Sequence, residues 1–207
     1  MTHCFSRRSF LKGSAAAAAV LSSPLLPADA AFSETENGLF SPVSALCQTQ
    51  YGPVKGREGE NGQLSWYGIP YGAAPTGESR WTAPQEPARW HTVRDCTSPA
   101  PAAYQYTTFP LGTEDCLTLD IYSSAEAKKR PVLVYLHGSA ATGSSLELPG
   151  CELVRDAGCV FVALNYRLGL FGWNCLPALT ADPDVTGNFA LLDLSLIHIS
   201  EPTRPRL

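Results

Sequence analysis

Two uninterrupted apolar runs constrain the fold of this chain more than any other feature. Residues 131–137 (PVLVYLH) and 159–165 (CVFVALN) are dominated by β-branched, aromatic and other apolar side chains. Such runs are typical of strands covered on both faces in a parallel sheet. Residues 147–157 between them predict a short crossover helix, which Gly158 ends. Strand, helix and strand in this order, with a glycine-containing turn after the first strand, predict an α/β fold with an open sheet.

The sequence before these strands predicts a smaller β-rich part. Residues 47–54 and 63–69 flank the polar, glycine-containing stretch 55–62, which predicts an antiparallel hairpin. Residues 117–123 alternate apolar and polar side chains, as a half-buried strand does. Glycine, proline and tryptophan dominate 71–101, so we expect a long ordered loop region there. A further helix is expected to begin near Asn188.

The first thirty residues have the features of an export signal. The segment S-R-R-S-F-L-K at 6–12 precedes an Ala/Leu-rich stretch, and Ala28-Asp29-Ala30 has the small-x-small pattern of a cleavage site. This order predicts a twin-arginine signal peptide at 1–30 and export to the periplasm or the outside. Residues 13–26 are too short, and too broken by serine and Pro24, for a stable membrane span. The alternative is a basic N-terminus on an ordinary surface helix.

Charge and cysteine usage narrow the possible partners. The formal net charge of −4 argues against nucleic-acid binding, which needs a basic face. Once Cys4 leaves with the signal, an even number of cysteines remains, which permits disulfides in an oxidising compartment without fixing their pairing. No C-x-x-C pair occurs, and His91 with His137 makes no cluster, so no metal site is predicted. The loop 137–143 lacks both phosphate-binding glycine patterns, which disfavours a nucleotide binder.

The last fourteen residues differ in kind from the sequence before them. The run LSLIHISEPTRPRL at 194–207 resembles the frame translation of a transposon-end sequencing adapter. We therefore predict three parts, namely the signal 1–30, a globular body 31–193 and a non-native tail 194–207. By pattern alone the tail could instead form a short strand at 196–199 followed by a proline-rich end.

Six motifs in order give the body a family resemblance. Together they resemble the N-terminal part of type-B carboxylesterases, the group that includes cholinesterases and bacterial para-nitrobenzyl esterases. The motifs are Y-G-I-P-Y-G at 67–72, the spaced set Pro75, Gly77, Arg80, Trp81 and Pro84, T-E-D-C-L-T-L at 113–119, the strand leading to His137-Gly138, N-Y-R-L-G at 165–169 and G-N-F-A-L-L-D at 187–193.

This resemblance implies a fold and a reaction, and it shows that the catalytic residues of the family are missing from this sequence. The fold is the N-terminal part of an α/β-hydrolase sheet, and the reaction is hydrolysis of a small carboxylic ester through a serine acyl-enzyme, with no cofactor. The nucleophile elbow G-x-S-x-G occurs nowhere in the 207 residues. We therefore expect no catalytic Ser, Glu or His of the triad here, a break before the elbow, and no activity of this chain by itself. The alternative is a non-catalytic, esterase-like adhesion or binding module.

The resemblance also assigns the oxyanion hole. Backbone N–H groups in the loop after the strand would stabilise the developing negative oxygen. By position the oxyanion hole comprises Gly138, which opens the turn, and the donors Ser139 and Ala140, and a third donor would follow the missing serine. H-G-S-A-A stands where the family has H-G-G-G-F or H-G-G-A-F. Ser139 thus replaces a glycine, and Ala141 replaces an aromatic residue and leaves room beside the acyl site. Without the resemblance, the loop is simply a small-residue turn.

Finally, the resemblance implies a disulfide and several structural residues. Cys116 is the family's usual disulfide member, but Ala103 stands at the usual partner position, so Cys96 is the expected partner. A Cys96–Cys116 bridge would close a loop of about 20 residues and stabilise the fold by roughly 3 kcal/mol; the alternative is two buried free thiols. Arg80 is expected to pair with Glu114-Asp115, and packing roles are expected for Trp66, Trp81, Trp90 and Tyr71.

Overall fold

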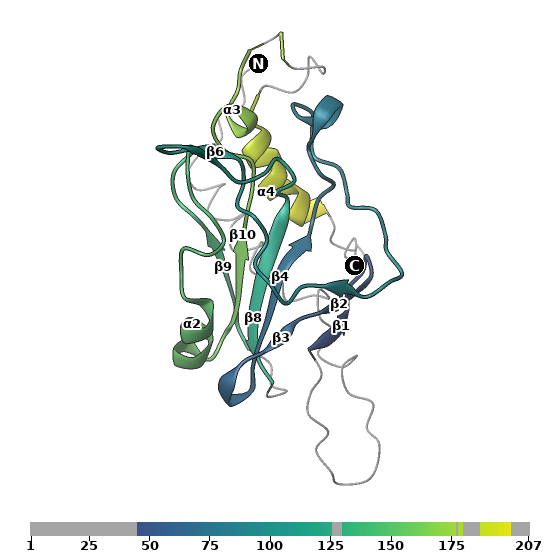
Figure 1. Cartoon of the computed structure of the whole chain (residues 1–207), viewed down its shortest axis with the longest axis vertical. Helices are drawn as coiled ribbons and strands as arrows, with labels where there is room; N and C mark the ends of the chain where they lie inside the picture. The colour runs from purple at the N-terminus through teal and green to yellow at the C-terminus, as the bar shows by residue number, and fades with distance from the viewer. Residues whose placement is uncertain (1–44, 126–129, 177, 180–186, 200–207) are drawn as a thin grey trace, which may run out of the picture.

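The computed structural model describes residues 45–125, 130–176, 178–179 and 187–199 (Figure 1). A five-stranded sheet forms its centre, with the strand order β3-β4-β8-β10-β9. These strands are β3 (Arg57–Glu58), β4 (Gln63–Pro70), β8 (Thr118–Ser124), β9 (Val132–Leu136) and β10 (Val160–Leu164). The signal 1–30 and its cleavage site lie outside the described residues.

The predicted strand–helix–strand unit is confirmed. β9 and β10 pair in parallel from Val132↔Val160 to Leu136↔Leu164, and helix α2 (Gly150–Ala157) connects them. Gly158 ends this helix in the left-handed region at φ +61°, and its N–H donates to the Val154 carbonyl. The other pairs of the sheet, β10 with β8, β8 with β4 and β4 with β3, are antiparallel. The sheet is therefore mixed, and α2 packs against β8 and β10.

The predicted hairpin between 47–54 and 63–69 is wrong, because the first run folds back on itself. β1 (Leu46–Gln48) pairs antiparallel with β2 (Pro53–Lys55), and β4 takes β3 as its hairpin partner. The turn between β1 and β2 is closed by Thr49, whose hydroxyl donates to the Gly52 carbonyl and accepts from the N–H groups of Tyr51 and Gly52. β5 (Arg94–Asp95) joins β2 to complete a separate three-stranded sheet.

The burial of two strands also differs from expectation. β8 was expected to be half-buried, but it lies between β4 and β10, and its first five residues are buried. β9 was expected to be covered on both faces, but it is an edge strand with Leu133 and Leu136 about half exposed, at 47% and 46%. Within the described part of the chain, no strand pairs with its outer edge.

Short elements surround the central sheet. Region 71–101 contains only η2 (Gly77–Ser79) and β5 as regular structure, which confirms the expected ordered loop. β6 (Gln105–Tyr106) and β7 (Pro110–Leu111) form a two-stranded hairpin, and α3 (Gly169–Gly172) follows β10. The 3-10 turn η1 (Glu60–Gly62) joins β3 to β4. Of the helices among the described residues, none has the length and apolar character to cross a membrane.

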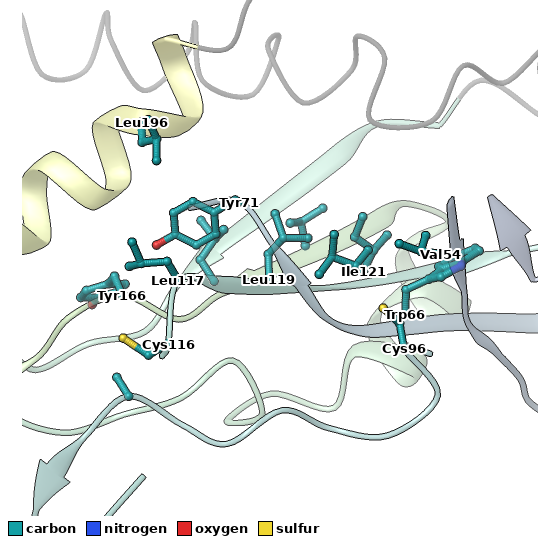
Figure 2. Packing of buried hydrophobic residues seen from close by; sticks show 14 of the residues in the cluster. Val54, Trp66, Tyr71, Cys96, Cys116, Leu117, Leu119, Ile121, Tyr166 and Leu196 are labelled. Atoms are coloured by element: carbon teal, nitrogen blue, oxygen red, sulfur yellow. The ribbon is translucent and has the colours of Figure 1, made fainter. Parts of the chain in front are cut away.

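The main core lies along β4 and β8 and is closed by the last helix. Figure 2 shows Val54, Trp66 and Ile121 at one end of this cluster, with Tyr71, Leu117 and Leu196 toward the other. Leu196 is 6% exposed and belongs to α4 (Phe189–Ile199). Residues 196–199 are therefore helical, and the alternative of a strand there is wrong. Conformation says nothing of origin, so the adapter origin of 194–207 stays a prediction; 200–207 lie outside the described residues.

Candidate active site

The predicted oxyanion loop begins at a rigid point, the end of β9. His137 is 3% exposed, and its ring stacks on Tyr166 with centroids 4.3 Å apart and planes 7° from parallel. The Tyr166 hydroxyl donates to the His137 carbonyl over 2.6 Å. Because Tyr166 follows β10 closely, these two contacts fix the start of the loop to the end of the neighbouring strand.

Ser139 adopts a backbone conformation that favours glycine. Its φ is +72°, in the left-handed region, which costs a residue with a Cβ about 1–2 kcal/mol. Its hydroxyl accepts hydrogen bonds from the N–H groups of Ala141 and Thr142, both over 3.2 Å. The Ser139 Cβ is strained at this φ, but the Ser139 hydroxyl closes the same turn through two hydrogen bonds. These bonds explain how serine is tolerated at a position where the family has glycine.

The hydrogen bonds of the loop divide its N–H groups into two sets. Those of Ala141 and Thr142 are bound by the Ser139 hydroxyl, and that of Gly143 donates to Gln105 Oε1 over 3.0 Å. Those of the three preceding residues find no acceptor within the described part of the chain, and all three residues are exposed: Gly138, Ser139 and Ala140. The residues predicted for the oxyanion hole are thus the ones with unused N–H groups, so this stretch can offer donors to an anionic oxygen.

Two further bonds hold the loop from neighbouring elements. The Ala140 carbonyl accepts from the Gly169 N–H of α3 over 2.7 Å. Ser145 is 1% exposed, and its N–H donates to Asn165 Oδ1 over 2.9 Å while its hydroxyl donates to Asp120 Oδ2 over 2.6 Å. Asp120 lies in the middle of β8, so these bonds connect the loop to the centre of the sheet.

Asp120 is a buried carboxylate held by polar neighbours. Its side chain accepts from Ser145 and, over 2.8 Å, from the Gly68 N–H in β4. Burial raises the pKa of the Asp120 carboxyl above its ordinary value, and the two hydrogen bonds oppose that rise. The Asp120 carboxylate therefore joins β4, β8 and the oxyanion loop. The alternating apolar and polar pattern of this strand does not indicate such a role.

Gln105 is a site residue that no sequence motif indicates. Its side-chain amide donates to the Gly143 carbonyl over 2.9 Å and accepts from the Gly143 N–H. Gly143 has φ +139°, and a Cβ there would lie 2.3 Å from His137 Nδ1. A glutamine in a loop-rich region carries no signal for such a bond, because the two residues are 38 positions apart.

The predicted Cys96–Cys116 bridge is wrong, since both residues are free thiols. Cys96 is held between β2 and β4, where its N–H donates to the Lys55 carbonyl and its carbonyl accepts from the Tyr67 N–H. Cys116 lies at the opposite end of the core, beside Tyr166 (Figure 2). Burial raises the pKa of Cys96 to about 11 and that of Cys116 to about 12, so both thiols are protonated at neutral pH. Cys47, Cys151 and Cys159 are free as well.

One predicted ion pair is present and a second, more buried one was missed. The Arg80 guanidinium contacts the Glu114 carboxylate through Nε–Oε2 at 2.5 Å and Nη2–Oε1 at 2.8 Å, whereas no ion pair joins it to Asp115 within the described residues. Arg167 and Asp193 form the second pair, with side chains 2% and 0% exposed. In the sequence, Arg167 belongs to the N-Y-R-L-G motif and Asp193 to the G-N-F-A-L-L-D motif, and neither motif indicates that the two residues pair.

The aromatic residues pack as expected, around the core and beside α3. Trp66 and Tyr71 are buried core residues, and the partly buried Trp90 packs against the same core cluster. Trp81 stacks on Phe171 with 6.2 Å between ring centroids. His91 is exposed, away from the core. Among the described residues, no group of three His, Cys, Asp or Glu side chains is placed to hold a metal ion.

Solved structures with the same arrangement are esterases. The chain superposes on a PNB esterase with a TM-score of 0.66 and 37% sequence identity, over 73% of this chain and 32% of that one. A Geobacillus stearothermophilus carboxylesterase gives 0.67 and 36%, over the same shares. The sheet is thus the N-terminal part of an α/β-hydrolase fold, as expected.

Sequence comparison gives the family. The chain belongs to the carboxylesterase family, whose model matches residues 43–197. Relatives include the para-nitrobenzyl esterase of Bacillus subtilis, 38% identical over 72% of this chain and 32% of the relative, and the juvenile hormone esterase of Tribolium castaneum, 33% identical over 77% and 29%. The chain therefore spans about a third of the length of these relatives.

The export signal is confirmed in the same way. A model of the twin-arginine translocation signal matches residues 4–23. The chain is therefore directed to the periplasm or the extracellular space by the twin-arginine route. Cleavage after Ala30 stays a prediction.

Proposed function

We propose that residues 31–193 supply the oxyanion loop of an exported hydrolase that cleaves small carboxylic esters through a serine acyl-enzyme. Membership of the carboxylesterase family supports ester hydrolysis. The observation that carries the proposal is that the N–H groups of Gly138, Ser139 and Ala140 have no acceptor among the described residues, whereas the next three N–H groups of the loop are bound.

The chemistry assigned to this loop is electrostatic. When a serine attacks an ester carbonyl, negative charge grows on the carbonyl oxygen in the transition state. Backbone donors that are already aimed at that oxygen stabilise it without reorganising, and losing one such donor costs on the order of 3–4 kcal/mol. The Ser139 turn and the Ala140–Gly169 bond hold the peptide groups around these donors in place.

The nucleophile must come from elsewhere, because no G-x-S-x-G motif occurs in these 207 residues. We infer that the intact gene product continues the family sequence after Asp193 and that the 207-residue chain does not hydrolyse esters. An independent long sequencing read across codon 194 tests this directly. It should show glutamine next and an elbow serine within a few dozen codons.

The intact product then tests the reaction. It should hydrolyse 4-nitrophenyl acetate and be labelled on one serine by a fluorophosphonate, whereas the 207-residue chain should do neither. An intact product with a degenerate elbow, no hydrolysis and no label would instead be the non-catalytic binding module. Hydrolysis by the 207-residue chain itself would show that the nucleophile lies within these residues, and it would contradict the proposal.

A further inference from the structure

Both ends of the Gln105 side-chain amide form hydrogen bonds, and these bonds fix its orientation. Nε2 donates to the Gly143 carbonyl over 2.9 Å and to the Ala103 carbonyl over 3.1 Å, while Oε1 accepts from the Gly143 N–H over 3.0 Å. Gln105 is 7% exposed, so little water competes for these bonds. Turning the amide over would break all three at once.

Two other side chains approach Gly143 closely. The position a Cβ would take lies 2.3 Å from His137 Nδ1 and 2.8 Å from Glu147 Oε1. The His137 ring and the Glu147 carboxylate therefore leave no room for a side chain on the backbone that the Gln105 amide binds. His137 begins the loop and Gly143 ends it, so both ends of the segment that contains Gly138–Ala140 are held.

We propose that Gln105 is a positioning residue for the oxyanion loop, which acts through Gly143 and touches no substrate. This inference rests on the proposed function of the loop. Donors contribute fully to an oxyanion hole only if they are aimed before the charge develops. With the Gln105 bonds removed, the Gly143 peptide groups lose the two hydrogen bonds that fix them, and the N–H groups of Gly138–Ala140 sample positions away from the oxyanion.

The test compares three variants of the intact esterase. Gln105→Met keeps the length of the side chain without its hydrogen bonds, and Gln105→Glu replaces the donating nitrogen by an oxygen that repels both carbonyls. Gln85→Met makes the same chemical change at an exposed glutamine whose amide, as far as the structure describes the chain, donates to the nearby Ala83 carbonyl alone. Active sites are counted by fluorophosphonate titration, and kcat and KM are measured with 4-nitrophenyl acetate.

We expect kcat per titrated site to fall about tenfold or more in both Gln105 variants, since removing one oxyanion donor outright costs 10²–10³-fold. KM should stay within about twofold, because the loop binds charge that appears in the transition state. The inhibition constant of a trifluoromethyl ketone, which mimics the tetrahedral intermediate, should rise in parallel with the loss of kcat. Gln85→Met should match the wild type.

An unchanged kcat per site, with fewer titratable sites, would make Gln105 merely structural and overturn the proposal. Hydrogen–deuterium exchange of residues 138–143 decides the case if a variant is too unstable for kinetics, or if the wild type proves inactive. Faster exchange in whichever Gln105 variant folds supports the positioning role of Gln105, and exchange equal to that of wild type refutes this role. A wild type without hydrolysis or label contradicts the proposed function alone.

Discussion

Arg167 and Asp193 form an ion pair that is removed almost completely from solvent, with 2.6 Å between Nη2 and Oδ1. The Arg167 N–H also donates to the Asp193 carboxylate, and its guanidinium donates to the carbonyls of Arg80 and Thr82. The pair therefore joins the segment after β10 to α4 and to the loop around η2. Its contribution to stability depends on both charges being present.

Removing one charge of this pair should destabilise the intact protein strongly. Asp193→Asn leaves the Arg167 charge buried without a counter-ion, so we expect the free energy of unfolding to fall by about 3–5 kcal/mol. Asp156→Asn is the matched control, because Asp156 pairs with Arg155 at the surface, and it should change stability little. Urea denaturation measures both. Equal effects of the two substitutions would contradict the assigned role.

The pH dependence of stability should carry a contribution from Asp120. Its folded-state pKa is raised by burial, so the folded state holds a proton that the unfolded state releases. That contribution to stability therefore falls as the pH rises from about 4, the unfolded value, through the raised folded value. Asp120→Asn cannot ionise, and its amide can still accept from Gly68 and donate to Ser145. We expect this variant to lose less stability between pH 4 and 7 than the wild type.

Asp95→Asn is the control for that measurement, with the opposite sign. Hydrogen bonds from the Thr97 hydroxyl and N–H lower the pKa of the exposed Asp95 carboxyl. Its contribution is present at neutral pH and is lost as the pH falls through the folded value. Denaturation curves extended from pH 7 to below pH 4 should therefore show Asp120→Asn departing from wild type above about pH 4, and Asp95→Asn departing with the opposite sign below about pH 4. Parallel curves for Asp120→Asn and wild type would refute the prediction for Asp120.

Substitutions at Ser139 should separate backbone strain from the hydroxyl bonds. Ser139→Ala keeps the Cβ at φ +72° and loses the bonds to Ala141 and Thr142, so it should destabilise the protein by about 1–2 kcal/mol. Ser139→Gly loses the same bonds but relieves the strain, and it should be close to neutral. Thermal denaturation ranks the two. If Ser139→Ala is at least as stable as Ser139→Gly, the backbone at residue 139 is not strained by a Cβ.

The body made alone, as residues 31–193, should fold badly. The outer edge of β9 has no partner strand among the described residues, and Leu133 and Leu136 are half exposed beside it. An open apolar edge is a template for pairing between chains, so we expect aggregation during size-exclusion chromatography. Leu133→Lys should reduce it by placing a charge at a half-exposed position of that strand. A soluble fragment that melts cooperatively as a monomer would disprove this prediction.

The parts of the fold that could be predicted are those set by local composition. The apolar runs at β9 and β10, Gly158 at the end of α2 and the small residues after His137 each signal their own structure. The Thr49 turn was missed because its hydroxyl folds back a run that otherwise looks like one strand. The Cys96–Cys116 bridge was wrong because strand pairing, which sequence spacing does not give, places the two thiols at opposite ends of the core. The Gln105–Gly143 and Arg167–Asp193 bonds likewise join distant segments.

The space around Gly143 sets a limit on how this loop can evolve. A side chain at that position would collide with the His137 ring and the Glu147 carboxylate, while the Gln105 amide binds the Gly143 backbone and keeps it from moving away. In a saturation library of the intact gene, selected for the proposed ester hydrolysis, codon 143 should therefore retain only synonymous changes. Lineages that diversify their substrate range must do so at freer positions, such as the exposed Ala141.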